Sequence, residues 1–271
     1  MADLDVLLLR FDAPLMSFGG VKVDERGVTD ETPGLSLLTG LIANAIGWDH
    51  RDAGRLERLQ ERLRIAVRRD RAGTSLEDFQ TVDLGQDFLA AGWTTRHAPE
   101  SRGGASGRGT HIRRRQYLAD AVFTVALALD AAAEDPTLAA VEEALRQPER
   151  PLFLGRKPCL PSSSLVLGTA RAATLKAAVT AAPLPHKPRW TAGPEAPRWT
   201  RRPAEPASRT DGEDGRFAVW WPQDDAPPPA AVAGDRRPVY DLRDWTNQVH
   251  VGRRFVYRGS VEISEEVRDG G

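Results

Sequence analysis

The run DVLLLRF at residues 5–11 is the stretch that decides the fold. It is short and almost continuously apolar, which is typical of a central strand buried on both faces of a sheet. A second run of this kind, AVFTVALAL, follows at residues 121–129. These two runs predict the two strongest strands of the chain.

Around these strands, apolar residues recur at helical spacing and predict helices over residues 35–46, 56–63 and 138–145. Thr32-Pro33 is the start signal of the first helix and Gly47 ends it. Asp135-Pro136 is expected to be the cap and first turn of the third helix. Shorter strands are predicted at residues 65–68, 152–155 and 164–168.

The order strand, helix, strand, strand, helix, strand indicates an α+β fold of the ferredoxin-like type, the topology that also underlies RNA-recognition-motif domains. We expect this domain to span residues 1–182. It contains an insertion at about residues 78–116, which is rich in glycine and arginine and is expected to project. The proline-rich stretch 183–238 is expected to be irregular and to dock through its tryptophans. Residues 239–271 predict a C-terminal strand pair that turns at Gly259.

The composition bounds the class of protein. The chain has 271 residues, a formal net charge of −1 and no apolar stretch long enough for a membrane span, so we expect no membrane partner. Its acidic N-terminus lacks the features of a signal peptide and predicts a cytoplasmic protein. The lone cysteine, Cys159, predicts a free buried thiol and no metal cluster. No metal or cofactor is expected.

Arginines cluster twice, at residues 96–115 and 236–258. In the first cluster Arg113-Arg114-Arg115 stands just before Tyr117. Three cations and an aromatic ring offer phosphate contacts and a stacking face, the combination that single-stranded RNA binding requires. A solvated charge run at the end of a loop is the alternative interpretation.

Two further segments are candidate RNA contacts. Gly155, Arg156 and Lys157 follow a predicted strand and predict a turn whose amides and cations hold a phosphate, with a simple surface turn as the alternative. Residues 13–20 form a loop that contains Ser17 and stands opposite the small-sided start of the first helix at Gly40. The small side chains there let another group come close to the backbone of the helix.

The motifs of common enzyme classes are absent: there is no phosphate-binding loop, dinucleotide fingerprint or nucleophile elbow. A metal-independent ribonuclease needs only a few side chains near a 2′-hydroxyl. His111 and Tyr117 with Lys157 are the one trio that could supply them.

An ordered series of segments resembles the CasD subunits, members of the RAMP superfamily, of type I-E CRISPR Cascade complexes. The series comprises Arg10–Gly19, Thr32-Pro33 with Ser36–Gly47, Val67–Asp70, Arg115–Val125 and Pro151–Cys159. Met16 stands where that family more often has glutamine, and Phe18 where it has tryptophan.

The resemblance implies an RNA-recognition-like fold with a projecting β-hairpin thumb. It implies a subunit that caps the 5′ handle of the CRISPR RNA in antiviral defence, contacts the large and backbone subunits of the complex, and meets target DNA only indirectly. Type I-E subunits of this kind are not nucleases, whereas their type I-C counterparts are. A processing endoribonuclease is therefore the second hypothesis, and a protein-only assembly scaffold is the third.

These arguments together give the residues expected to contact RNA. They are Arg10, Ser17, Gly40, Arg68, Arg96, Arg108, His111, Arg113, Arg114, Arg115, Tyr117, Gly155, Arg156 and Lys157.

Overall fold

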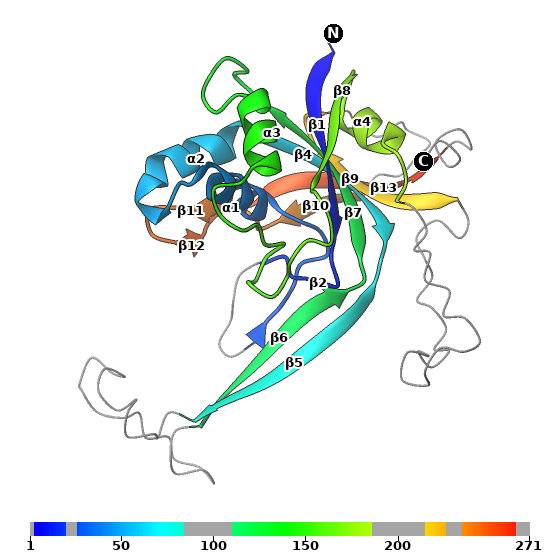
Figure 1. Cartoon of the computed structure of the whole chain (residues 1–271). Coiled ribbons are helices and arrows are strands. Elements are labelled where there is room, and N and C mark those ends of the chain that lie inside the picture. Colours follow the sequence, from blue (N-terminus) through cyan, green and yellow to red (C-terminus); the bar gives the residue numbers. More distant parts are fainter. Residues whose placement is uncertain (1–2, 20–25, 84–109, 186–214, 226–234, 264–271) are drawn as a thin grey trace.

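The largest element of the computed structural model is a seven-stranded antiparallel sheet (Figure 1). The structure describes residues 3–19, 26–83, 110–185, 215–225 and 235–263. In spatial order the strands are β10 (Asp235–Val239), β13 (Arg254–Glu262), β9 (Arg216–Pro222), β4 (Leu63–Arg71), β7 (Val122–Leu129), β1 (Leu4–Asp12) and β8 (Val166–Ala172). Both runs that decided the fold, β1 and β7, are central strands and pair with one another.

Helices cover both faces of this sheet, as the burial of every residue of β7 requires. On one side lie α1 (Leu35–Ile46), α2 (Ala53–Arg62) and α3 (Leu138–Arg146), and on the other lies α4 (Leu175–Ala181) (Figure 1). A short 3-10 helix, His50–Asp52, precedes α2. The prediction of a mixed α+β fold is confirmed.

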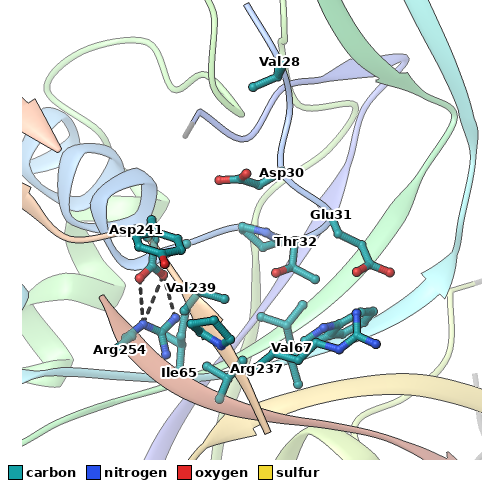
Figure 2. A pocket seen from close by; sticks show the side chains of 16 residues that line it. Val28, Asp30, Glu31, Thr32, Ile65, Val67, Arg237, Val239, Asp241 and Arg254 are labelled. Carbon is teal, nitrogen blue, oxygen red and sulfur yellow. Dashed lines mark hydrogen bonds and ion pairs between the residues drawn. The ribbon is translucent and has the colours of Figure 1, made fainter. Parts of the chain in front are cut away.

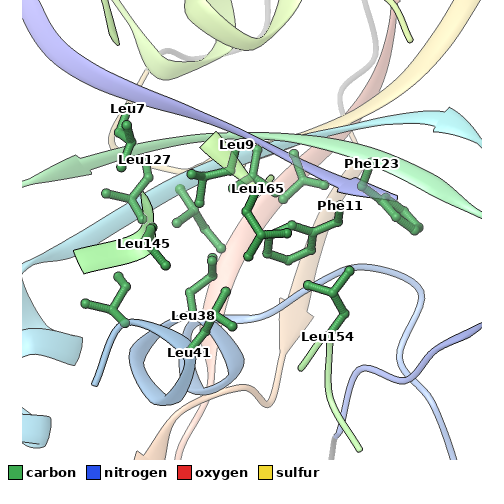
Figure 3. Close-up of a cluster of buried hydrophobic side chains, with 14 of the residues drawn as sticks. Leu7, Leu9, Phe11, Leu38, Leu41, Phe123, Leu127, Leu145, Leu154 and Leu165 are labelled. Atoms are coloured by element: carbon green, nitrogen blue, oxygen red, sulfur yellow. The ribbon is translucent and has the colours of Figure 1, made fainter. Parts of the chain in front are cut away.

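The main core lies between the sheet and α1. Side chains alternate along β1, so Leu9 and Phe11 point toward this core while Leu8 packs on the α4 side. Figure 3 shows Leu9 and Phe11 beside Leu38 and Leu41 of α1. Full burial of an apolar side chain of this size contributes about 1.5–3 kcal/mol, so this layer fixes α1 firmly against the sheet.

The start of α1 is tied to the C-terminal part of the chain. Asp241 accepts the Leu35 amide through its carboxylate at 2.8 Å and the Ser36 amide through its carbonyl at 3.0 Å. Arg254 of β13 holds the same carboxylate at 2.6 Å. A Cβ at Gly34 would lie 2.6 Å from the Asp241 Cβ, so only glycine lets the two segments approach this closely.

A long ribbon projects from the body of the molecule (Figure 1). It consists of β5 (Thr74–Asp83) and β6 (Thr110–Ala119), which are antiparallel to one another. At its base β2 (Leu15–Met16) and β3 (Arg26–Gly27) pair with β6. The ribbon begins and ends outside the predicted insertion 78–116, because regular pairing extends to Thr74 and Ala119.

Residues 84–109 lie outside the described part of the chain. The predicted RNA contacts Arg96 and Arg108 fall in this range.

Three predictions about the second half of the chain are wrong. Residues 216–222 are not irregular: they form β9, which pairs with β4 and β13 and buries Trp220 and Trp221. Gly259 is no turn but lies within β13. A Cβ there would meet the Trp221 ring at 3.0 Å, so the glycine makes room for the indole. Residues 235–238, also placed in the irregular stretch, belong to β10.

Two local predictions also need correction. Residues 152–155 form no strand and belong to a turn-rich loop. The cap of α3 is Thr137, whose hydroxyl accepts the Ala140 amide, and not Asp135-Pro136. Cys159 is a free buried cysteine, as predicted, and burial raises the pKa of its thiol.

A small hairpin of β11 (Arg243–Asp244) and β12 (Val249–His250) precedes β13 and packs near α1 and α2. No helix within the described ranges is both long and apolar enough to cross a membrane.

Candidate nucleic-acid interface

A groove of about 430 Å³ brings together four of the predicted RNA contacts, which are far apart in the sequence. Ser17 comes from the loop after β2, Gly40 from α1, and Gly155 and Arg156 from the loop before β8. The other lining residues are Gly19, Ser36, Leu37, Leu41, Asn44, Phe153, Arg243, Trp245 and His250. The structure is thus consistent with the prediction that another group can come close to the small-sided face of α1.

The loop around Gly155 is locked onto Ser17. Gly155 has φ +111° and a Cβ there would lie 1.8 Å from the Ser17 carbonyl oxygen, so no other residue fits. The Ser17 amide donates to the Leu154 carbonyl at 3.1 Å, and the Ser17 hydroxyl accepts the Arg156 amide at 3.1 Å. The Cys159 thiol lies 3.7 Å from the same hydroxyl. Ser17 therefore positions this wall of the groove.

Arg156 does not have the free guanidinium that the predicted phosphate-binding turn required. Its side chain donates to the carbonyls of Gln116 at 2.6 Å and Gly27 at 2.9 Å and lies over the Tyr117 ring. It joins the loop to β6 and β3 and leaves Lys157, which is exposed, as the uncommitted cation of this turn.

The third wall of the groove was missed by the sequence analysis. It is the β11–β12 hairpin, which contributes Arg243, Trp245 and His250. Three of its nitrogen atoms, Arg243 Nε, Trp245 Nε1 and His250 Nδ1, are buried without a hydrogen-bond partner among the described residues. An unpaired buried polar atom costs about 1–3 kcal/mol, so a ligand that pairs with these atoms after a small local shift would be favoured.

Charge distinguishes this groove from a second pocket of about 450 Å³ between residues 28–34 and β10. Figure 2 shows that second pocket with Asp30, Glu31 and Asp241 on its walls and Arg254 against Asp241. Carboxylates repel phosphate. Among the described residues, the groove is lined by two arginines and a histidine and by no carboxylate, so it suits a polyanion better.

The basic run on β6 continues from the groove along the ribbon. Alternation along a strand places Arg113 and Arg115 on the same face as Tyr117, the face against which the Arg156 side chain lies. Neither arginine has an ion pair with a described carboxylate. Arg114 points to the opposite face, where it pairs with Glu77 at 3.4 Å and lies over Phe79.

Arg10 and Arg68, two further predicted RNA contacts, do not line this groove, and both side chains have partners within the fold. Both lie on the α4 side of the sheet, away from the groove. Arg68 is fully buried, pairs with Asp70 at 2.5 Å and donates to carbonyls at the end of α4. Arg10 donates to Thr124 and to the Pro183 carbonyl, and burial lowers the pKa of its guanidinium.

The hypothetical catalytic trio is also not assembled. Tyr117 is only 3% exposed, so it cannot offer a base a stacking face or a hydroxyl a free approach. His111 lies six residues away on the same strand, which separates the two backbones by roughly 20 Å. Within the described ranges no group of three His, Cys, Asp or Glu side chains could hold a metal ion.

The sequence matches the family of CRISPR-associated proteins described as Cas_Cas5 over residues 6–257. The chain belongs to the Cas5 family. Among its relatives is the CRISPR system Cascade subunit CasD of Escherichia coli (strain K12), 32% identical over 174 residues, which are 61% of this chain and 71% of the relative. The resemblance inferred from the ordered motifs is confirmed.

Two solved structures resemble this Cas5 chain over nearly its whole length. One is a chain of a CRISPR RNA-guided surveillance complex, with a TM-score of 0.56, 26% identity and coverage of 95% of this chain and 90% of the other. The second, described as a Cas protein, has a TM-score of 0.55, 23% identity and coverage of 97% of both chains, and supports the fold alone.

Proposed function

We propose that this Cas5 chain is a non-catalytic subunit of a CRISPR RNA-guided surveillance complex that binds the 5′ handle of the CRISPR RNA in the groove between Gly155, α1 and the β11–β12 hairpin. The observation that carries the proposal is the groove itself, which in the described part of the chain has cations, no carboxylate and three buried nitrogens without a hydrogen-bond partner. Donors of this kind match phosphate oxygens, 2′-hydroxyls and base edges of an unpaired strand.

The RNA would leave the groove along the ribbon. Arg115 and then Arg113 lie beyond the groove on one face of β6. The phosphates of an RNA strand bound at Gly155 would therefore meet these two arginines one after the other. We assign the β5–β6 ribbon to the thumb of the family and infer that it marks where the backbone subunits stop. The large subunit and the adjacent backbone subunit are the protein partners, and target DNA is met only through them.

The core of the proposed domain is ferredoxin-like. The strands β4, β7, β1 and β8 lie in the order 2-3-1-4 when they are numbered along the chain within this set, and α1 and α3 pack on one face. This supports residues 1–182 as the RNA-recognition-like unit, extended at one edge by β9, β13 and β10.

An acid placed in the groove tests the RNA site. Ser36 is the second residue of α1, where an acidic side chain favours the helix dipole, so Ser36→Asp is expected to fold normally. Its charge should weaken binding of a labelled single-stranded handle RNA about tenfold, or about 1.4 kcal/mol. Fluorescence anisotropy measures the affinity. The neutral control Ser36→Asn should bind within about twofold of wild type. Equal affinity of the acidic and neutral variants would contradict the groove.

Incubation with labelled repeat RNA in the presence of a chelator separates binding from catalysis. We expect binding and no cleavage, because His111 and Tyr117 are too far apart on one strand to act on one 2′-hydroxyl. Clean removal of the upstream repeat half by wild type, and its loss in His111→Ala, would instead establish the endoribonuclease hypothesis.

A further inference from the structure

Two arginines of the second cluster, Arg236 and Arg253, help to form a surface on the side of the sheet that faces α4, opposite the groove. We call it the cation–aromatic stripe. Its members are Lys176, Tyr257, Arg236, Phe255 and Arg253, together with the ring of Trp221, which is itself buried.

Strand register builds the stripe. Tyr257 of β13 has Arg236 of β10 as its cross-strand neighbour on one side and Trp221 of β9 on the other. The rings of Trp221 and Tyr257 are 5.8 Å apart. Two residues from Tyr257, Phe255 returns to the same face by strand alternation, and Arg253 precedes it on that face.

Cations cover the rings at both ends. Lys176 Nζ lies 4.1 Å from the centroid of the Trp221 ring. At the other end the Arg236 guanidinium carbon lies 3.6 Å, and that of Arg253 5.4 Å, from the centroid of Phe255. Arg236 and Arg253 are exposed, and Phe255 and Tyr257 are half-buried, so rings and guanidinium planes are both accessible from solvent.

The arginines on the two faces of β10 and β13 differ in their ion pairing. On the face away from α4, Arg237, Arg254 and Arg258 pair with Asp235, Asp241 and Glu31, respectively. On the stripe face, Lys176, Arg236 and Arg253 have no ion pair with any carboxylate in the described ranges. Arg236 donates a hydrogen bond to the neutral side-chain amide of Gln223 at 3.0 Å. The positive charge of the stripe is therefore uncompensated, unlike that of the opposite face.

We infer that the cation–aromatic stripe is a second nucleic-acid site, for an unpaired strand distinct from the one in the groove. A guanidinium that stacks on a ring with one face leaves the other face for a base, and the cations neutralise phosphates. A duplex lacks unstacked bases, so a single strand is the ligand that uses both features. RNA and DNA share this chemistry.

The test measures anisotropy of labelled single-stranded oligonucleotides, one RNA and one DNA of the same sequence, with the full chain. Unlabelled handle RNA at saturating concentration occupies the groove during this measurement, and its own affinity is measured in a separate titration. Absence of binding at the stripe and absence of binding in the groove therefore give different results. Arg236→Gln/Arg253→Gln is compared with Arg237→Gln, which changes the same strand on the opposite face. Phe255→Leu tests stacking without changing the charge.

The double variant should bind about tenfold more weakly, and the slope of log affinity against log salt should fall in magnitude by about 1.4, the value for two lost phosphate contacts. Phe255→Leu should weaken binding about fivefold, and Arg237→Gln less than twofold. Preference for either oligonucleotide identifies the natural strand. A double variant that binds like wild type, or an equal loss in Arg237→Gln, would overturn the proposal.

Discussion

Replacement of Gly155 by alanine is expected to lower the free energy of unfolding by about 3 kcal/mol and to abolish handle binding. The added Cβ would lie 1.8 Å from the Ser17 carbonyl oxygen, and φ +111° is unfavourable for any L-residue. Steric overpacking costs about 1–3 kcal/mol and the backbone conformation about 1–2 more. This overlap is relieved only if the Gly155 loop moves away from Ser17, and that movement removes one wall of the groove. Urea unfolding and RNA anisotropy measure the two effects.

Gly19→Ala is the matched control, because Gly19 lines the same groove and a Cβ there meets nothing within 4 Å. It should leave stability within about 0.5 kcal/mol of wild type and preserve binding. A Gly155→Ala protein that is as stable as the control and binds RNA equally well would refute the described loop geometry.

Arg68→Met should destabilise the fold by about 3–5 kcal/mol while leaving the groove chemically unchanged. The substitution removes the ion-pair partner of the buried Asp70 carboxylate, whose remaining hydrogen bond among the described residues comes from the Thr124 hydroxyl. It also removes the donor to the Val179 and Ala182 carbonyls at the end of α4. The thermal midpoint and urea unfolding measure the loss.

Two comparisons make this result specific. Arg171→Met removes an ion pair whose side chains are 78% and 69% exposed, and should cost less than about 1 kcal/mol. Arg68→Met/Asp70→Asn no longer leaves a buried charge and should recover part of the stability. If Arg68→Met folds as well as Arg171→Met but loses RNA binding, Arg68 is an RNA contact after all.

The elements that the sequence predicted correctly are those whose own residues show that they are buried. β1 and β7 are continuous apolar runs, and α1 carries both its periodicity and its terminal Gly47. β9 was missed because its surroundings are rich in proline, although the run from Phe217 to Trp221 between Gly215 and Pro222 carried the signal. Its place between β4 and β13 depends on pairing partners that no local pattern contains.

Local sequence patterns also predicted part of the groove. The sequence indicated close approach at the small-sided start of α1 near Gly40 and a phosphate-binding turn at Gly155, and the structure brings both together with Ser17. The hairpin wall was missed because β11 and β12 are two residues long each and meet α1 across about 200 residues of sequence. For Arg68, the signal was Asp70 two residues later on a buried strand, a spacing that places both side chains on one face.

Photo-crosslinking locates the bound 5′ handle on the protein and so tests directly whether the groove is the RNA site. A CRISPR RNA with a photoreactive uridine in its 5′ handle is bound to the full chain, irradiated and digested, and the crosslinked peptides are identified by mass spectrometry. We expect crosslinks to the groove walls, at residues 153–157 and 243–250. Crosslinks confined to the carboxylate-lined pocket at residues 28–34, or to β8, would contradict it.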